Sequence, residues 1–201
     1  MTELLLVRHG ESLFNAQERW VGWEDESPLT AKGVEEAQAL AERLATEADI
    51  LAIYSSPLQR AWQTAQFISK AVGLPPIPVP GLREINVGRV AGLTQAQFAL
   101  RFPEYQARWK NRADLDFTWP GGEKRADFFR RAASAVGQII NTHPHGKVLV
   151  VCHGGVIRAT LAHYLPQDYS EWWAYSLHTA SLTRLSVAAE GSRLLSLNEY
   201  P

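Results

Sequence analysis

The sequence predicts an α/β fold: a three-layer sandwich with a mostly parallel central sheet, helices on both faces and a small helical cap. Short apolar runs alternate along the chain with segments of helical spacing. Two of these runs, at 4–7 and 148–151, each lead into a histidine followed by glycine. In open α/β sheets ligands bind beyond the carboxyl ends of the strands, so His9 and His153 are expected to lie together there. A looser stretch at about 78–122 supplies the cap.

The spacing of apolar residues, and the capping, proline and glycine residues between them, predict the elements in chain order. They are a strand at 4–7, a helix at 30–48, a strand at 50–54, a helix at 58–72, cap helices at 95–101 and 103–112, a helix at 123–141, a strand at 148–151, a helix at 156–164 and strands at 181–187 and 193–197. Thr30 is expected to cap the first helix, and Ser56 the second, with Pro57 in its first position. The glycine and prolines of residues 73–76 end that helix. Because the chain shows no internal repeat and no linker, residues 1–201 are expected to form a single domain.

Composition excludes several classes of function. Hydrophobic residues are 46% and charged residues 20% of the chain, as in soluble globular proteins, and the net charge of −1 gives no indication of a nucleic-acid or membrane partner. The single cysteine, Cys152, excludes an internal disulfide and is expected to be an inert small hydrophobe in a buried strand. There is no signal-peptide pattern and no stretch of about 20 apolar residues. We therefore expect a soluble cytoplasmic protein.

Three strand-to-helix junctions carry the groups that a phosphate pocket needs. A phosphoryl group carries roughly −1.5 to −2 charges near neutral pH, so its pocket requires hydrogen-bond donors and cations. Arg8 precedes His9 and can make a forked contact with phosphate oxygens. Arg60 lies near the positive end of the second helix, and Gly154 and Gly155 offer unhindered backbone N–H groups. An isolated arginine such as Arg60 would more simply form a surface ion pair, but three matching junctions favour an anion site.

Two-step hydrolysis needs a nucleophile and a proton donor. A histidine with a pKa near 6.5 can attack phosphorus as the neutral imidazole and form a phosphohistidine. An acid must then protonate the leaving alkoxide and later act as base on water. Glu84 is the candidate, because it begins the segment that can cover the sheet edge. Glu11, interpreted as a helix N-terminal charge, and Glu36, interpreted as part of the polar face of its helix, remain rivals.

Five blocks of sequence follow one another between Leu4 and Arg158. They are Arg8-His9-Gly10-Glu11-Ser12 with Asn15, Ser55-Ser56-Pro57-Leu58-Gln59-Arg60-Ala61, Leu82-Arg83-Glu84 with Gly88, Pro120-Gly121-Gly122-Glu123, and His153-Gly154-Gly155-Val156-Ile157-Arg158. In these blocks and their order the chain resembles the histidine phosphatase superfamily, in its phosphoglycerate mutase-like branch (branch 1). The resemblance covers most of the chain and implies a histidine phosphatase-like domain in which residues 78–122 form a cap that sets substrate specificity.

The resemblance also implies roles for individual residues. His9 would be the phosphorylated nucleophile and Glu84 the acid and base, while Arg8, Arg60 and His153 would hold the phosphoryl group. The other phosphate- and substrate-binding positions that it implies are Ser12, Asn15, Gly22 and Gly154. Neither a metal ion nor another cofactor is implied. The remaining histidines, none of which shows metal-ligand spacing with a cysteine or carboxylate, are His143, His145, His163 and His178.

Relatives in this branch divide into phosphatases, which pass the phosphoryl group to water, and cofactor-dependent mutases, which return it to a bisphosphorylated sugar acid. The segment Gly22-Trp23-Glu24-Asp25 is similar to both. Mutases carry a small hydroxyl residue, a tyrosine and a phosphate-contacting lysine where this chain has Val21, Val87 and Gln95. These departures favour a phosphomonoesterase acting on a small phosphorylated metabolite. A cofactor-dependent phosphoglycerate mutase is the alternative, and a non-catalytic pseudoenzyme that binds phosphorylated ligands is a further one.

The cap has more cations than anions. Its cations are Arg89, Arg101, Arg108, Lys110 and Arg112, and the aromatic residues among them are Phe98, Phe102, Tyr105, Trp109, Phe117 and Trp119. The excess could attract a substrate with a second anionic group, and the aromatic residues could form an apolar pocket wall. Alternatively, the aromatic residues pack the cap onto the sheet and the cations are solvated. A homodimer is the default expectation for the quaternary structure.

Overall fold

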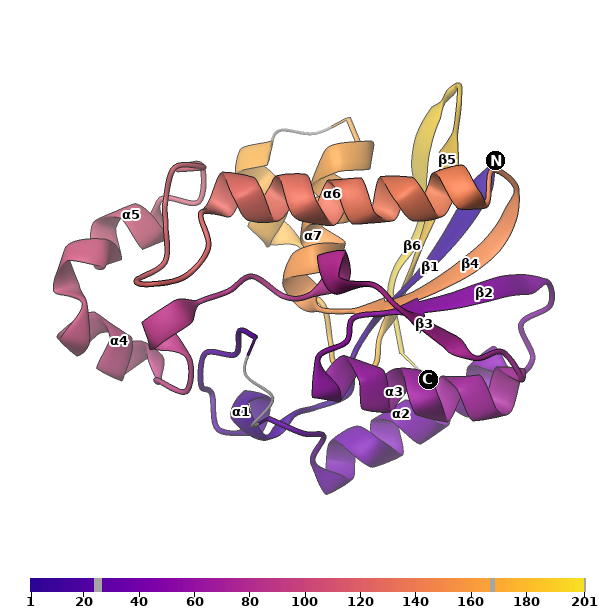
Figure 1. The fold of residues 1–201 in the computed structure, drawn as a ribbon, viewed down its shortest axis with the longest axis horizontal. Helices are drawn as coiled ribbons and strands as arrows, with labels where there is room; N and C mark the ends of the chain where they lie inside the picture. The colour runs from indigo at the N-terminus through magenta and orange to yellow at the C-terminus, as the bar shows by residue number, and fades with distance from the viewer. Residues whose placement is uncertain (24–26, 167–168, 201) are drawn as a thin grey trace.

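A six-stranded sheet forms the centre of the computed structural model, which describes residues 1–23, 27–166 and 169–200. Its strands are β1 (Thr2–Arg8), β2 (Ile50–Ser55), β3 (Pro76–Pro78), β4 (Gly146–Cys152), β5 (Leu182–Ala188) and β6 (Gly191–Glu199). They lie in the order β3-β2-β4-β1-β5-β6 (Figure 1). The first four are parallel, while β5 is antiparallel to β1 and β6 to β5. The expected mostly parallel sheet is confirmed.

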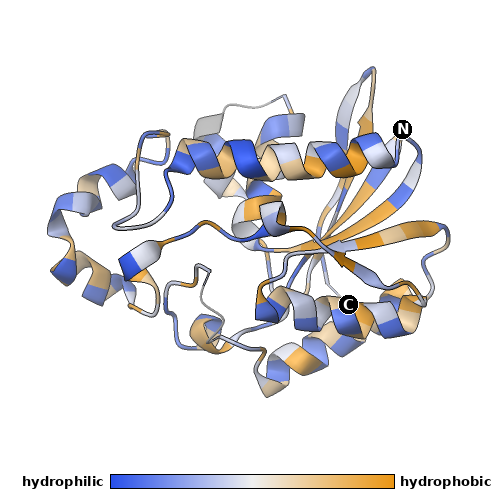
Figure 2. Cartoon of the chain, in the orientation of Figure 1, coloured by the Kyte–Doolittle hydropathy of each residue, from blue (hydrophilic) through white to orange (hydrophobic). Residues whose placement is uncertain are grey.

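Helices cover both faces of this sheet. The helices α2 (Ala31–Leu44) and α3 (Gln59–Val72) pack on one face, and α6 (Arg125–Thr142) and α7 (Gly154–Tyr164) on the other (Figure 1). Successive side chains of β1 alternate between the two cores: Leu4 and Leu6 pack toward α6 and α7, and Leu5 and Val7 toward α2 and α3. Burial on both faces explains why the strand sequence is continuously apolar. The helices, in contrast, alternate hydrophobic and hydrophilic stretches along their length (Figure 2).

Several predicted helix boundaries were wrong, and the helices expected at 123–141 and 156–164 begin at Arg125 and Gly154. Thr30 caps α2 as expected, since its hydroxyl accepts from the Gly33 N–H at 3.0 Å, but the helix ends at Leu44 instead of residue 48. The next predicted apolar position, Ala48, is exposed, so nothing extends the buried stripe. In α3, Pro57 precedes the helix, which begins at Gln59. The Ser56 N–H donates to the Val151 carbonyl at 2.9 Å, which continues the strand pairing past β2 and delays the helix.

Sequence patterns missed several small elements. The strand β3 begins and ends with proline, which removes the usual strand signal but is tolerated at a sheet edge. The 3₁₀ turn η4 (Tyr169–Ala174) is too short for a periodic pattern. The helix expected to start after Arg8-His9-Gly10 is present, but only as the short helix α1 (Leu13–Ala16). No helix within the described ranges combines the length and apolar composition needed to cross a bilayer.

The turn η1 (Pro80–Leu82) packs its Leu82 into the core beside α6, and the short helices that follow it extend away from the sheet (Figure 1). They are η2 (Gly88–Val90), α4 (Gln95–Arg101), η3 (Pro103–Tyr105) and α5 (Gln106–Lys110). Their side chains form a separate core in which Phe98, Phe117 and Trp119 are buried, with Trp20 packed against them. The aromatic residues of the cap therefore pack mainly among themselves.

Candidate active site

Strand register brings the two histidines together. β1 and β4 pair with Arg8 opposite Cys152, so His9 and His153 are the first residues beyond neighbouring strands. The His9 N–H donates to the Cys152 carbonyl at 3.1 Å. Their imidazole rings are 5.1 Å apart at 62°, and only 3% of His9 and none of His153 is exposed.

The hydrogen bonds of His9 define its tautomer. Nδ1 lies 2.7 Å from the Gly10 carbonyl, which can only accept, so Nδ1 carries the ring proton. Nε2 then has a free electron pair, and the Arg60 Nε–H donates to it at 3.2 Å. Burial lowers the pKa of His9 well below its ordinary value, and the charges of Arg60 and Arg8 lower it further. His9 is therefore a neutral imidazole whose Nε2 carries no proton.

His153 is held in the complementary arrangement. Its Nε2 lies 2.8 Å from the Ser56 hydroxyl, whose oxygen also accepts from the Leu58 N–H at 3.3 Å. With the hydroxyl donating to Nε2, the ring proton sits on Nδ1, which is buried and has no partner in the described part of the chain. Burial lowers the pKa of His153 well below its usual value, helped by the charge of Arg60. Nδ1 thus presents an unused donor.

Two arginines bring positive charge to the histidines. Arg60 is almost fully buried, and its Nη2 donates to the Gly22 carbonyl at 3.0 Å. Arg8 donates from Nη1 to the Leu177 carbonyl at 2.5 Å, whereas its buried Nε meets no acceptor among the described residues. Burial and the charge of Arg158 lower the pKa of Arg8. An anion bound here would supply the missing acceptor.

Glu84 approaches the site from the segment between η1 and η2. Its two carboxylate oxygens accept from the Ile85 N–H at 2.8 Å and the Gly155 N–H at 3.0 Å. A Cβ on Gly155 would lie 2.1 Å from Glu84 Oε1, so only glycine allows this contact. Arg131 holds the backbone of the segment by donating to the carbonyls of Gly81 and Arg83, both at 2.9 Å.

Arg131 is itself fixed by Glu123. Its Nε and Nη2 donate to the two oxygens of the Glu123 carboxylate at 2.9 and 2.8 Å. Its Nη2 also donates to the Glu84 carbonyl at 3.2 Å, as does the Trp23 Nε1–H at 2.6 Å. Arg131 was not anticipated from the sequence, because it lies on a helix face with no motif. Glu123 belonged to a recognised block without an assigned function.

A polar cavity of about 230 Å³ joins these groups. It is lined by Arg8, His9, Asn15, Arg19, Trp20, Val21, Arg60, Glu84, Gly154, Gly155 and Arg158. Of the residues to which the resemblance gives a role, Arg8, His9, Asn15, Arg60, Glu84 and Gly154 are therefore on its walls, and His153 is buried beside His9. Ser12 and Gly22 are not on the walls. Ser12 instead donates from its hydroxyl to Asn15 Oδ1 at 2.9 Å, and the Gly22 carbonyl accepts from Arg60. Both residues therefore orient side chains that line the cavity.

The rival carboxylates lie elsewhere. Glu11 accepts from the Thr30 hydroxyl at 2.9 Å and from Lys32 at 3.1 Å, near the start of α2. Glu36 was expected on a polar helix face but is only 9% exposed, because its carboxylate accepts from the Glu11 N–H at 2.8 Å. Neither lines the cavity. Glu24 and Asp25 lie outside the described residues.

Arg158 and Arg19 line the cavity without having been assigned a role from the sequence. Arg158 lies four residues after Gly154 on α7, and this helical spacing could have placed both on one face. Arg19 follows α1 in a segment with no such signal. Cys152 is buried, and burial raises the pKa of its thiol, which confirms the expected inert residue. In the described ranges no three His, Cys, Asp or Glu side chains are grouped to hold a metal.

A family model described as the histidine phosphatase superfamily (branch 1) matches residues 4–200. The chain belongs to this superfamily. It is 42% identical over 161 residues to a metal-independent phosphoserine phosphatase of Arabidopsis thaliana, covering 79% of this chain and 67% of the relative. It is 37% identical over 167 residues to a 2,3-bisphosphoglycerate-dependent phosphoglycerate mutase of Gloeobacter violaceus, covering 80% and 74%.

Solved structures of the superfamily share the fold. A mycobacterial glucosyl-3-phosphoglycerate phosphatase superimposes with a TM-score of 0.87 at 33% identity, covering 98% of each chain. The predicted α/β class is confirmed by this similarity, and a phosphomonoesterase is the enzyme class that the superfamily and its phosphatase relatives indicate.

Proposed function

We propose that this superfamily member hydrolyses monoesters of small phosphorylated metabolites through a phosphohistidine on His9. The observation that carries the proposal is the His9 tautomer: Nε2 keeps its electron pair inside a cavity that is also lined by four arginines and a carboxylate. Such an imidazole is a nucleophile already aligned for attack, because its proton is engaged on the opposite ring nitrogen.

In the first step, Nε2 of His9 attacks phosphorus and the bond to the ester oxygen breaks. Glu84, in its protonated form, gives its proton to the departing alkoxide. In the second step, Glu84 takes a proton from water while the water oxygen attacks phosphorus and the N–P bond breaks. Inorganic phosphate leaves, and neutral His9 and protonated Glu84 are restored.

The cations and unused donors stabilise the transferring group. Arg8 Nε and His153 Nδ1 lack acceptors in the described structure, and Arg60 already contacts the attacking nitrogen. The N-terminus of α7 adds backbone N–H groups at Gly154. Positioned donors and charge in a buried site are usually the largest contribution to such catalysis.

Water, rather than a hydroxyl group of a phosphorylated sugar acid, is the proposed acceptor of the phosphoryl group. Val21 lines the cavity and Val87 lines the space next to it, where mutases of this branch carry hydroxyl side chains. Valine can neither donate to nor accept from a sugar-acid phosphate. A cytoplasmic location and a homodimer stay predictions from the sequence.

Trapping the intermediate tests the proposal. Wild-type protein quenched during turnover of a radiolabelled aryl phosphate should carry an acid-labile, base-stable phosphoryl label. His145→Gln removes an exposed imidazole at the opposite end of β4 and should retain the label, whereas His9→Ala should lose it. Wild-type protein with neither label nor turnover would overturn the enzyme assignment. Sugar-acid phosphate isomerisation that requires a bisphosphorylated primer and outpaces hydrolysis would establish the mutase instead.

A further inference from the structure

The polar cavity that contains His9, Arg60 and Glu84 is called the phosphate cavity below. A second cavity of about 350 Å³ opens beside it. The two share the lining residues Trp20, Val21, Glu84, Gly155 and Arg158. One ligand could therefore place its phosphate against His9 and the rest of its structure in the second cavity. At about 30 Å³ per water molecule in the liquid, this volume corresponds to on the order of ten water-sized groups. That is more than the alcohol part of a three-carbon hydroxy acid would fill.

Most of the second cavity's wall is apolar. Besides Trp20 and Val21, it is formed by Ile85, Val87, Trp109, Trp119, Trp172 and Trp173. Such a surface stabilises a body of carbon atoms, preferably one with flat faces, by removing it from water.

Arginines and an indole N–H interrupt this apolar wall. Arg112 has its guanidinium 4.5 Å from the Trp109 ring and makes no hydrogen bond or ion pair through its side chain with any described residue. Burial and the charge of Arg158, on the same wall, lower the pKa of Arg112. Trp109 is only 6% exposed, yet its Nε1–H has no acceptor in the described structure. Since an indole N–H can only donate, an acceptor is missing here.

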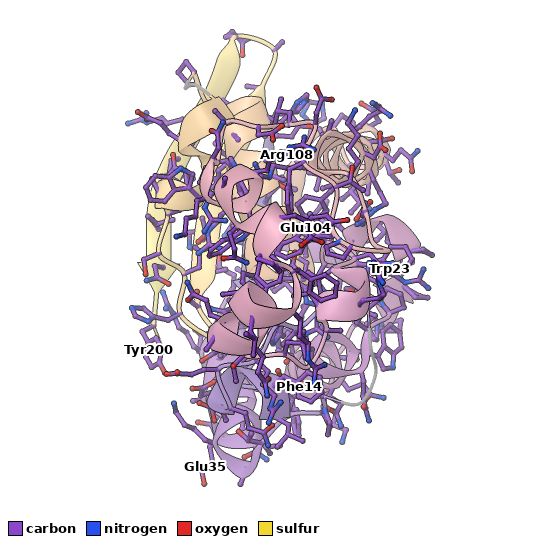
Figure 3. The ribbon with its side chains drawn as sticks, turned by 90° about the vertical axis from the view of Figure 1, so that its left-hand side faces the viewer. Phe14, Trp23, Glu35, Glu104, Arg108 and Tyr200 are labelled. Atoms are coloured by element: carbon purple, nitrogen blue, oxygen red, sulfur yellow. The ribbon has the colours of Figure 1, made fainter. Side chains whose placement is uncertain are left out.

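The other cations of the region already have acceptors, and Arg158 donates from Nε to the Tyr175 carbonyl at 2.8 Å. Arg125 lines the same cavity, but its Nη1 donates to the carbonyls of Asn111 at 2.8 Å and Asp114 at 2.7 Å. Arg108, on the outer side of the cap (Figure 3), pairs with Asp114 at 2.8 Å. Among the described residues of the wall the single carboxylate is Glu84, which accepts from two backbone N–H groups and is needed at the phosphate. Arg112 thus remains the arginine on this wall whose side chain has no hydrogen-bond acceptor among the described residues.

We propose that this cavity binds a second anionic group on the substrate, most simply a carboxylate, between Arg112 and the Trp109 Nε1–H. The substrate class is then a phosphomonoester whose alcohol contains an apolar, ring-sized body with the anion at its far end. The proposal rests on the proposed function, because the phosphate end must lie against His9. Arg112 is the specificity-determining residue.

A matched pair of substrates tests this assignment without any variant. 4-(Carboxymethyl)phenyl phosphate and 4-(carbamoylmethyl)phenyl phosphate have similar shapes, and their methylene group insulates the phenol oxygen from the difference in charge. A hydrogen bond to a charged group contributes about 1.5–3 kcal/mol, so kcat/KM should favour the carboxylate by roughly 10- to 100-fold. Equal kcat/KM values for the two substrates in wild-type protein would overturn the proposal.

Arg112→Gln should then remove the preference. We expect kcat/KM for the carboxylate substrate to fall by roughly 10- to 100-fold, mainly through KM, and that for phenyl phosphate to change less than about twofold. Arg101→Gln, which removes the same charge from an exposed position on α4, controls for long-range attraction and should keep the preference. Equal losses on both substrates would show a structural role for Arg112 and contradict the proposal. Failure of the proposed function gives a different result: no aryl phosphate would be hydrolysed, whether or not it carries a carboxylate.

Discussion

The two adjoining cavities are built in different ways. The phosphate cavity lies at the ends of β1, β2 and β4, where the ladder pairs Arg8 with Cys152 and Ser55 with Val151. Its key contacts involve backbone groups, such as the Gly10 carbonyl on His9 and the Gly155 N–H on Glu84. The second cavity is lined by side chains of the cap, such as Trp109 and Arg112, which pack around their own aromatic core, together with residues of η4 and residues that it shares with the phosphate cavity. Chemistry is thus set by the sheet, and recognition by a surface that can change without disturbing it.

The largest effect is expected at the nucleophile. His9→Ala should reduce turnover of every phosphomonoester by on the order of 10⁴-fold or more, because the remaining groups stabilise charge but cannot carry the phosphoryl group. Measuring kcat with phenyl phosphate and with an alkyl phosphate checks this. If His9→Ala lost activity on only one of the two substrates, the separation of chemistry from recognition would be contradicted.

Glu84 lies on the walls of both cavities, so its substitution sharpens the comparison. Glu84→Gln should lower kcat/KM, which reports the steps up to departure of the alcohol, by about 10²–10⁴-fold for an alkyl phosphate, since general acid catalysis is worth that much. With 2,4-dinitrophenyl phosphate the loss in kcat/KM should be much smaller, because this leaving group needs no proton. Glu11→Gln and Glu36→Gln, at the two rival carboxylates, should leave that dependence on the leaving group unchanged. An equal loss on both substrates for Glu84→Gln would reassign the proton donor.

Backbone control of Glu84 can be tested through Gly155. Gly155→Ala would put a methyl group 2.1 Å from Glu84 Oε1 and must displace the carboxylate. We expect kcat on alkyl phosphates to fall by roughly 10- to 100-fold, as a misplaced catalytic group commonly costs. The matched control is Gly137→Ala in α6, where the nearest atom to the new Cβ is the Tyr164 hydroxyl at 3.5 Å. That substitution should keep full activity and raise helix stability by up to about 1 kcal/mol. Full activity in Gly155→Ala would show that the contact is dispensable.

Sequence alone predicted the phosphate cavity better than the second one, and for a physical reason. His9, Arg60 and Gly154 follow apolar strands or begin helices, and parallel strands bring their carboxyl ends to one edge regardless of side-chain detail. Arg112 and Trp109 were visible only as members of a basic, aromatic segment, because their partners are set by the packing of short helices. Arg131 was not predicted, because it donates hydrogen bonds to backbone carbonyls and no residue pattern indicates such contacts.

Acid sensitivity should also originate in the phosphate cavity. The pKa values of buried His9 and His153 lie well below the ordinary 6.5, so below that pH the unfolded chain binds protons that the folded protein does not. The free energy of unfolding should therefore fall as pH decreases below about 6.5, by up to about 1.4 kcal/mol per pH unit for each histidine, and level off above it. Urea unfolding between pH 5 and 8 measures this slope.

A variant that removes one imidazole separates this contribution from the carboxylates, which protonate at lower pH. His153→Gln should halve the slope between pH 6.5 and 5.5, whereas Arg112→Gln in the second cavity should leave it unchanged, because an arginine keeps its charge throughout this range. An unaltered slope in His153→Gln would mean that His153 binds its proton equally in the folded and unfolded states. Burial and the neighbouring positive charges would then not lower the affinity of His153 for a proton. The two cavities would differ in shape and lining but not in their effect on the pH dependence of unfolding.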